Sequence, residues 1–323
     1  MRGKLWWPGV MFVIVLTTLA FPGAGGAAQG SVTPTPLPKA VDVTGFCHAP
    51  AQMTFLVLGV SPTFRFGMGD AIRLVRVDFA HLRLVVVPLP RDLYVDLPWD
   101  SAYPSPIKLT SAYFLGTPLM SGGGALSGGV RLMADTVAYN FKVPVDRYVA
   151  VDLRGFRAFV NAINAIGGIP VDIPYAIHDR ASGAHFEPGH YLLDGRQALA
   201  LARARMDRPG FVRAERQGWV IQGILRSLAD PETFTQLPQI VATLRSAVLT
   251  DIPAEDVARL LCFYGAFVAA GRTPEVLPVP TDLVRPTMDW VFIGREPHVA
   301  SVVVWDDAYV DWIRQALEGP GSP

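Results

Sequence analysis

The alternation of strand-length apolar runs with amphipathic helical segments constrains the fold of this chain more than any other feature. Residues 53–60 and 82–90 are continuous apolar runs, and residues 71–79 alternate apolar with charged side chains. Runs of this kind are typical of strands that are covered on both faces. Residues 128–141 and 154–166 instead carry apolar side chains near the three-to-four spacing of an amphipathic helix. Strands that alternate with helices predict an α/β sandwich.

Beyond residue 168 the same pattern continues and then becomes mostly helical. Asp194 is expected to cap a helix, because its carboxylate can accept hydrogen bonds from the free N–H groups of a first turn. The expected elements in order are a strand over 169–175, helices over 195–202, 215–229, 231–249 and 253–270, a strand over 298–305 and a helix over 307–317. No composition break separates a second domain, so residues 51–228 are predicted to form one domain, with residues 229–323 as a mostly helical part packed on it.

The N-terminus has the order of an export signal. Arg2 and Lys4 precede an uncharged apolar run over residues 5–20, and small residues follow this run. This order fits either a cleaved signal peptide or a retained membrane anchor within residues 1–28, and the sequence leaves both open. In both cases the rest of the chain lies outside the cytoplasm, because the positive end stays inside. Residues 29–50 are rich in Pro, Thr, Ser and Gly and are predicted to be a linker.

Composition bears on two further questions, the redox state of the cysteines and the charge of a ligand. Cys47 and Cys262 are the two cysteines of the chain. They can pair in an oxidising compartment, but they lie far apart in sequence, and their pairing stays open here. The formal net charge of zero excludes nucleic-acid binding through overall positive charge. A site for anions must therefore be a local concentration of positive side chains.

Such a concentration occurs in one short arginine-rich stretch. Arg203 and Arg205 are two residues apart and point to one face if the segment is extended. Arg213, Arg216 and Gln217 share one face if their segment is helical. Planar guanidinium groups that converge on one spot suit phosphate oxygens better than lysines do. The alternative is a solvated basic helix whose arginines pair with neighbouring carboxylates.

Other charged side chains stand beside predicted strands. Arg91 and Asp92 directly follow an apolar run, and loops after strand ends are where α/β sheets bind ligands. Asp70 stands at the entrance to a strand, while Lys108 and Tyr113 occur in an otherwise uncharged stretch. Each charged residue among them is either part of a local salt bridge or a contact to phosphate or metal.

The order of these motifs resembles that of the LytR–CpsA–Psr family over about residues 53–226. The matching strings, which are specific in combination, are "FLVLGV", "GDAIRLV", "PLPRDLYVDLP", "KLTSAY", "VPVDRYVAVDLRGF", "AIGGIPVDIP", "GHYLLDGRQALALARARMD" and "RAERQ". Members move a glycopolymer from a polyprenyl-pyrophosphate carrier onto peptidoglycan or another bacterial envelope acceptor. The resemblance therefore implies an extracytoplasmic phosphotransferase at the membrane, with Mg²⁺ or Mn²⁺ as cofactor. It also implies a three-layer α/β/α sandwich with a central mixed sheet and an apolar lipid-binding tunnel.

Carried over position by position, the resemblance assigns roles to individual residues. The residues that match the family's pyrophosphate contacts are Arg91, Lys108, Arg203, Arg205, Arg213, Arg216 and Gln217. Arg91, Asp92 and Arg203 are the expected catalytic residues, with Asp92 or Asp70 as a candidate base for the acceptor hydroxyl. Asp70 is also the expected metal ligand, and Tyr113 belongs to the family motif Lys-x-x-x-Ala-Tyr. Arginines and a metal suit this reaction because a pyrophosphate leaving group gathers negative charge as its bond breaks.

The sequence departs from the family at this same site. Ser61 stands where members usually carry Asp, Met68 where they carry Arg, and Leu201 where they carry Tyr. A hard divalent cation needs oxygen ligands, so the loss of a carboxylate predicts weak metal binding without the substrate's own phosphates. Two main functions stay open, a working phosphotransferase and an envelope protein that binds polyprenyl-linked lipid without efficient transfer. Hydrolysis of the pyrophosphate is a third.

Three histidines, His178, His185 and His190, stand in a stretch that contains Gly and Pro. Their spacings of seven and five match no common pattern of metal ligands. We therefore expect no metal site in this stretch.

Overall fold

The computed structural model describes residues 42–164, 168–204, 210–228 and 248–319. Within these ranges no helix combines the length and the hydrophobicity that crossing a membrane requires. The predicted signal peptide or membrane anchor and most of the predicted linker lie before the first described residue.

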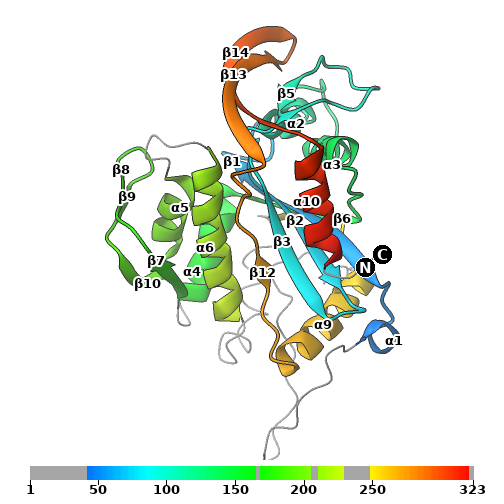
Figure 1. Ribbon diagram of the computed structural model, residues 1–323, viewed down its shortest axis with the longest axis vertical. Helices are drawn as coiled ribbons and strands as arrows, with labels where there is room; N and C mark the ends of the chain where they lie inside the picture. Colours follow the sequence, from blue (N-terminus) through cyan, green and yellow to red (C-terminus); the bar gives the residue numbers. More distant parts are fainter. Residues whose placement is uncertain (1–41, 165–167, 205–209, 229–247, 320–323) are drawn as a thin grey trace, which may run out of the picture.

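A six-stranded sheet forms the centre of the molecule (Figure 1). Its strands, in spatial order, are β11 (Val248–Thr250), β6 (Arg147–Asp152), β1 (Gln52–Ser61), β2 (Met68–Asp78), β3 (Arg83–Leu89) and β12 (Glu275–Val276). β1, β2 and β3 pair antiparallel, whereas β6 runs parallel to β1 and β12 runs parallel to β3. The sheet is therefore mixed, and the predicted strands over 53–60, 71–79 and 82–90 are confirmed as its three central members.

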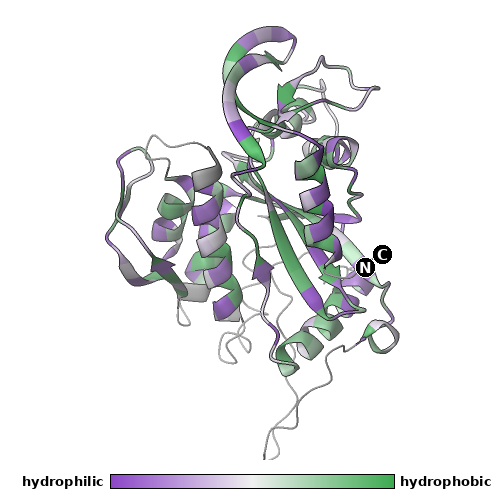
Figure 2. Cartoon of the chain, viewed as in Figure 1, coloured by the Kyte–Doolittle hydropathy of each residue, from purple (hydrophilic) through white to green (hydrophobic). Residues whose placement is uncertain are grey.

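Side chains on the two faces of the sheet enter two separate apolar cores. Phe55 on β1 belongs to one core, and its neighbour Leu56 belongs to the other, as the two-residue period of a strand requires. The helices that contribute to the first core are α4 (Leu153–Asn164), α5 (Gly195–Arg203), α6 (Gly210–Leu228) and α9 (Ala254–Ala269). Those of the second are α2 (Leu109–Leu115), α3 (Gly128–Phe141) and α10 (Asp307–Glu318). The predicted three-layer α/β/α sandwich is confirmed, and Figure 2 shows β3 as a mainly hydrophobic strand inside it.

Within the described residues, four two-stranded ladders surround the central sheet. They pair β4 (Tyr94–Val95) with β5 (Ile107–Lys108), β7 (Ile169–Ile173) with β10 (Gly189–Leu193), β8 (Ile177–Asp179) with β9 (Ala184–Phe186), and β13 (Val284–Ile293) with β14 (Glu296–Trp305). The β13–β14 ladder extends well beyond the layers at the top of the view (Figure 1).

The described residues of the C-terminal part, 248–319, contain strands as well as the predicted helices. α9 and α10 match the predicted helices, but the end of the predicted helix over 231–249 forms β11 instead, and the rest of that helix lies outside the described residues. β12 and β13 were not predicted at all. β13 is exposed over most of its length, so its side chains lack the apolar alternation of a half-buried strand. The sequence pattern therefore does not predict it.

The predicted linker ends in a short ordered element. α1 (Thr44–Cys47) packs against α9, and Cys47 forms a disulfide bond with Cys262 of that helix, with their Cα atoms 5.5 Å apart. The pairing that the sequence left open is thereby resolved. Val43 is already buried in the core, so packed structure begins inside the segment that was predicted as a linker.

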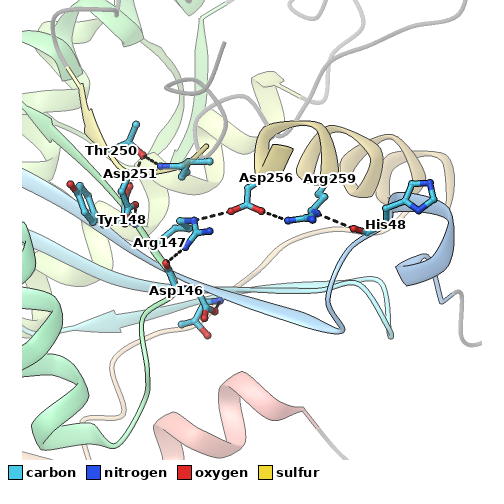
Figure 3. A network of polar contacts seen from close by, with 10 residues as sticks. His48, Asp146, Arg147, Tyr148, Thr250, Asp251, Asp256 and Arg259 are labelled. Atoms are coloured by element: carbon cyan, nitrogen blue, oxygen red, sulfur yellow. Dashed lines mark hydrogen bonds and ion pairs between the residues drawn. The ribbon is translucent and has the colours of Figure 1, made fainter. Parts of the chain in front are cut away.

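A polar network reinforces this attachment of α1 and α9 to the sheet (Figure 3). The buried carboxylate of Asp256 on α9 accepts hydrogen bonds from Arg147 Nε at 2.8 Å and Arg259 Nη1 at 2.6 Å. Arg259 Nε also donates to the backbone carbonyl of His48 at 2.9 Å. Arg147 begins β6, so the network connects the sheet, α9 and the residue that follows α1.

Candidate functional site

The strand directions bring distant polar residues to one edge of the sheet. β1, β3 and β6 run the same way, so the residues at or after their carboxyl ends, Ser61, Arg91 and Asp152, lie at the same edge. Asp70 lies there too, because it is near the start of the antiparallel strand β2. Sites at the carboxyl ends of strands are common in α/β sheets, since the strand ends leave polar backbone and loop side chains uncovered.

Four of the predicted site residues form one series of ion pairs with alternating charge. Arg91 Nη1 contacts the Asp70 carboxylate, and Arg91 Nε lies 3.6 Å from Asp92 Oδ1. Lys108 on β5 donates from Nζ to the same Asp92 oxygen at 3.3 Å. All four side chains are partly exposed, so an incoming anion can reach the two cations in competition with the two carboxylates.

A cavity of about 120 Å³ adjoins Asp70, between the sheet and helices α4, α5 and α6. Its lining is mainly apolar, and it includes side chains from β1, β2 and β6 as well as from these helices. The apolar lining residues are Val60, Ala71, Val151, Leu153, Phe156, Leu199, Ala202, Val220 and Ile221. The polar lining residues are Ser61, Asp70, Asp152, Arg203 and Gln217. The cavity therefore places an apolar volume beside charged groups.

Arg203 reaches this cavity from the last position of α5. That helix begins at a capping box, in which Asp194 Oδ1 accepts from the Gln197 N–H at 2.7 Å and Gln197 Oε1 accepts from the Asp194 N–H at 3.0 Å. The predicted cap is confirmed, and it fixes the helix whose final residue, Arg203, is an exposed cation. Arg205 lies outside the described residues, so its predicted role stays a prediction.

The two arginines of α6 that were predicted to bind the anion do not form a solvated basic face. Arg213, Arg216 and Gln217 are all buried, so this alternative to an anion site is wrong for them. Arg216 Nη1 donates to the carbonyl oxygen of Ala204 at 2.7 Å, and the guanidinium carbon lies 5.9 Å from the ring centroid of Tyr175. In this arrangement Arg216 holds the residue after α5 against α6. Of the three, only Gln217 lines the cavity.

Arg73 on β2 is a buried residue of the site that the sequence analysis did not identify. Its guanidinium donates to the carbonyl oxygens of Ile72 at 2.8 Å and Ala214 at 2.9 Å, and to Gln217 Oε1 at 3.1 Å. Burial lowers the pKa of Arg73 to about 10, so the side chain stays protonated at neutral pH. Because Gln217 Oε1 accepts from Arg73, the amide nitrogen of Gln217 faces Asp70 and donates to its carbonyl oxygen at 3.4 Å. Arg73 thus determines how the Gln217 amide is oriented at the cavity.

Asp152 is the second residue that was missed. It lines the cavity, and its Oδ1 accepts from the N–H groups of Arg154 at 3.0 Å and Gly155 at 2.9 Å at the start of α4. Ser61, Asp70 and Asp152 together supply oxygen atoms, which are the ligands that Mg²⁺ and Mn²⁺ prefer. Asp152 is the last residue of β6, a strand that the sequence patterns did not indicate, so the rule about strand ends did not reach it.

Tyr113 lies beside the site rather than in it. Its side chain on α2 is fully buried, its hydroxyl donates to the Phe64 carbonyl oxygen at 3.1 Å, and burial raises its pKa. A Cβ atom at Gly129 of α3 would lie 2.6 Å from the Tyr113 carbonyl oxygen, so the two helices are in close contact at this point. Tyr113 therefore holds the segment between β1 and β2, which carries Ser61 at one end, against the helical layer.

Comparison with known protein families establishes the family of this chain. The sequence profile described as the LytR_cpsA_psr family matches residues 31–269. This chain belongs to the LytR–CpsA–Psr family. Among its relatives are the "Regulatory protein MsrR" of Staphylococcus aureus and the "Polyisoprenyl-teichoic acid--peptidoglycan teichoic acid transferase TagV" of Bacillus subtilis. MsrR is 28% identical over 185 residues, or 57% of this chain and 51% of MsrR, and TagV is 28% identical over 210 residues, or 63% of this chain and 50% of TagV.

The fold agrees with solved structures of LytR–CpsA–Psr proteins. The crystal structure of Bacillus subtilis TagV superposes with a TM-score of 0.60 at 23% identity, covering 83% of this chain and 96% of that structure. At this identity the agreement concerns the fold. In sequence, this chain spans about half the length of the curated relatives that it matches.

Proposed function

We propose that this LytR–CpsA–Psr protein is an extracytoplasmic phosphotransferase. It moves a glycopolymer from a polyprenyl-pyrophosphate carrier to peptidoglycan or another acceptor of the envelope. The observation that carries the proposal is the apolar cavity that Arg203 and Asp70 line, because Asp70 pairs with Arg91 and so begins the series of ion pairs that ends at Lys108. The ligand that suits both parts is an amphiphile with an apolar chain and an anionic head, as a polyprenyl pyrophosphate is.

Two further observations support this proposal. The relative TagV carries the name of a transferase that acts on polyisoprenyl-linked teichoic acid and peptidoglycan. The disulfide bond between Cys47 and Cys262 suits a protein on the outer side of the membrane, because reducing systems keep most cytosolic thiols unpaired.

In the proposed reaction, the oxygen of an acceptor hydroxyl forms a bond to the phosphorus that carries the glycan. The bond from that phosphorus to the bridging oxygen breaks, and the lipid leaves as polyprenyl phosphate. Arg91, Lys108 and Arg203 stabilise the charge that collects on the phosphate oxygens. The proton of the hydroxyl passes to a carboxylate, for which Asp92 and Asp70 are the candidates because both already lie beside Arg91.

The lining of the cavity suits a divalent cation in part. Asp70, Asp152 and the Ser61 hydroxyl would hold Mg²⁺ or Mn²⁺ together with the phosphates of the substrate. The cation would neutralise charge on the pyrophosphate. Because Asp70 is paired with Arg91 and one oxygen of Asp152 already caps α4, we expect weak metal binding until the substrate supplies its own oxygens.

A second function competes with this one, a protein that binds polyprenyl-linked lipid without efficient transfer. The observation that favours it is Ser61, which lines the cavity at the position where the family usually has a carboxylate. A hydroxyl is a weaker ligand for a divalent cation than a carboxylate. The apolar lining would still bind the lipid chain if the head group were held too loosely for reaction.

One experiment distinguishes these functions. The full chain, in detergent, is given a polyprenyl-pyrophosphate glycan and an acceptor, and the release of polyprenyl phosphate is measured with and without Mg²⁺. We expect Mg²⁺-dependent release that falls by about a hundredfold or more in Arg203→Ala, in line with the loss of a group that stabilises transition-state charge. The matched control is Arg226→Ala, an exposed arginine of α6 that pairs with Asp172 and does not line the cavity.

The possible results of this experiment distinguish the transferase from the lipid-binding protein. Lipid binding without release would support the binding protein, and neither binding nor release would contradict both functions. Equal loss in Arg203→Ala and Arg226→Ala would show that the cavity does not decide the activity.

A further inference from the structure

The β8–β9 hairpin pairs two histidines that the sequence separates by seven positions. In its antiparallel register Ile177 lies opposite Phe186, and His178 lies opposite His185. Side chains alternate between the two faces of a strand, so the first pair points inward and is buried while the second pair points outward and is exposed. The sequence spacing does not reveal this pair, because the register of the hairpin determines the distance between its members.

Glu187, the residue after β9, joins the two histidines. Its Oε1 lies 2.9 Å from His178 Nε2, and the imidazole rings of His178 and His185 stack with centroids 4.4 Å apart and planes 17° apart. One ligand atom from each of the three side chains lies within 4.8 Å of the other two. Two imidazoles and a carboxylate thus converge on one exposed point of the surface.

The backbone on both sides of this cluster is held in place. In the turn between the strands, the Gly183 N–H donates to the Asp179 carbonyl oxygen at 2.9 Å, and Gly183 adopts a φ of 77°, which glycine reaches without strain. At the other end, the Tyr191 hydroxyl accepts from the Glu187 N–H at 3.2 Å and donates to the Glu187 carbonyl oxygen at 3.0 Å. The three ligands therefore start from fixed Cα positions, and only exposed side chains have to move.

We propose that His178, His185 and Glu187 bind a divalent late transition-metal ion, with Zn²⁺ as the representative. Imidazole nitrogens suit Zn²⁺, Cu²⁺ and Ni²⁺, whereas Mg²⁺ prefers oxygen ligands alone. Metal–ligand bonds of about 2.1 Å place tetrahedral ligand atoms about 3.4 Å apart. The ligand atoms of the three side chains now lie within 4.8 Å of one another, and small rotations of these exposed side chains bring them to the tetrahedral separation. Three protein ligands leave one tetrahedral position for water or for an exchangeable group.

This site is separate from the site of phosphoryl transfer. None of its three residues lines the cavity. The hairpin nevertheless begins two residues after Tyr175, whose ring packs edge-on against Trp219 at 5.5 Å and lies beside Arg216. A metal that cross-links β8 to β9 would restrict the motion of the hairpin and of the segment that carries Tyr175. We therefore assign the ion a role in stabilising this flank of α6 rather than a role in the reaction.

The test is calorimetric titration of Zn²⁺ into the full chain, prepared without a polyhistidine tag, beside His178→Ala and His185→Ala. The matched control is His190→Ala, because His190 is also exposed but pairs with Asp172 instead of the cluster. We expect one Zn²⁺ per chain, at least a tenfold loss of affinity in each cluster variant, and unchanged affinity in the control. Millimolar Mg²⁺ should not displace the bound Zn²⁺.

Two results would overturn the proposal. One is wild-type affinity for Zn²⁺ in either cluster variant, and the other is equal loss in His190→Ala. Circular dichroism of each variant establishes that lost binding is not lost folding. Mg²⁺-dependent lipid release should be the same in His185→Ala as in the wild type, so failure of the zinc site and failure of the proposed transferase function are distinguishable.

Discussion

Replacement of Arg73 by methionine tests how the cavity is supported. The substitution removes a buried guanidinium that connects β2 to α6 through the Ala214 carbonyl and the Gln217 side chain. Methionine has a similar length and no donor. Three acceptor oxygens, two carbonyls and one amide, then lose the same partner, and the Gln217 amide loses the contact that fixes its orientation.

The expected cost follows from two opposing contributions. A buried acceptor that loses its donor costs about 2 kcal/mol, or about 6 kcal/mol for the three. Burial of the charged guanidinium opposes folding. It lowers the pKa of Arg73 to about 10, a shift that corresponds to a desolvation cost of roughly 3 kcal/mol. Methionine removes this cost. The lost hydrogen bonds therefore outweigh the relief of desolvation. We expect Arg73→Met to lower the free energy of unfolding by about 3 kcal/mol and the melting temperature by about 6–12 °C.

Chemical denaturation followed by tryptophan fluorescence measures this change, with Arg285→Met as the matched control. Arg285 is an exposed arginine on β13, so its replacement should change stability by less than about 0.5 kcal/mol. Lipid release at a temperature where the variant stays folded should also fall in Arg73→Met, because Gln217 is no longer held. A loss of stability below about 1 kcal/mol, or full lipid release from the folded variant, would refute this reasoning.

Two further predictions concern the stability of the fold. Cys262→Ala removes a bond to Cys47 that closes a loop of 215 residues, for which loop entropy predicts a loss of about 5 kcal/mol as an upper value. Denaturation with and without reductant should show a loss of about 2–5 kcal/mol, and an unchanged midpoint would show that α1 is held without the bond. Gly223→Ala places a Cβ atom 2.6 Å from the Pro170 carbonyl oxygen and 2.5 Å from Ile169 Cγ2. The overlap should outweigh the gain in helix propensity of about 1 kcal/mol, for a net loss of about 1–2 kcal/mol in a thermal melt, and a stabilised variant would contradict the close contact of α6 with β7.

The sheet and part of the site could be predicted because their signals are local. Apolar runs of strand length sufficed for β1 and β3, and the alternation of apolar and charged residues sufficed for β2. The rule that ligands bind beyond strand ends singled out Arg91 and Asp92, and the structure places Arg91 between Asp92 and Asp70. Asp152 ends β6, a strand that was not predicted, so the rule was not applied there.

The remaining features depend on contacts that spacing along the chain does not encode. Arg73 looked like a polar residue of an alternating strand, yet a central strand covered on both faces must bury it. The opposition of His178 and His185 depends on a hairpin register, which no helical or motif spacing expresses. The bond from Cys47 to Cys262 depends on where α1 packs on α9, a contact between segments 215 residues apart in sequence.

The disulfide bond also determines how a mechanical load on the N-terminal side would enter the protein. A pull at Asp42 reaches Cys47 within a few residues and passes through the covalent bond into α9, and from there through Asp256 into β6. The cavity lies at the other end of β1, whose ten residues span about 30 Å. A tethered molecule would therefore hold its cavity at a distance from the tether, and tension on the tether would be borne by the part of the protein that binds nothing in the proposed reaction.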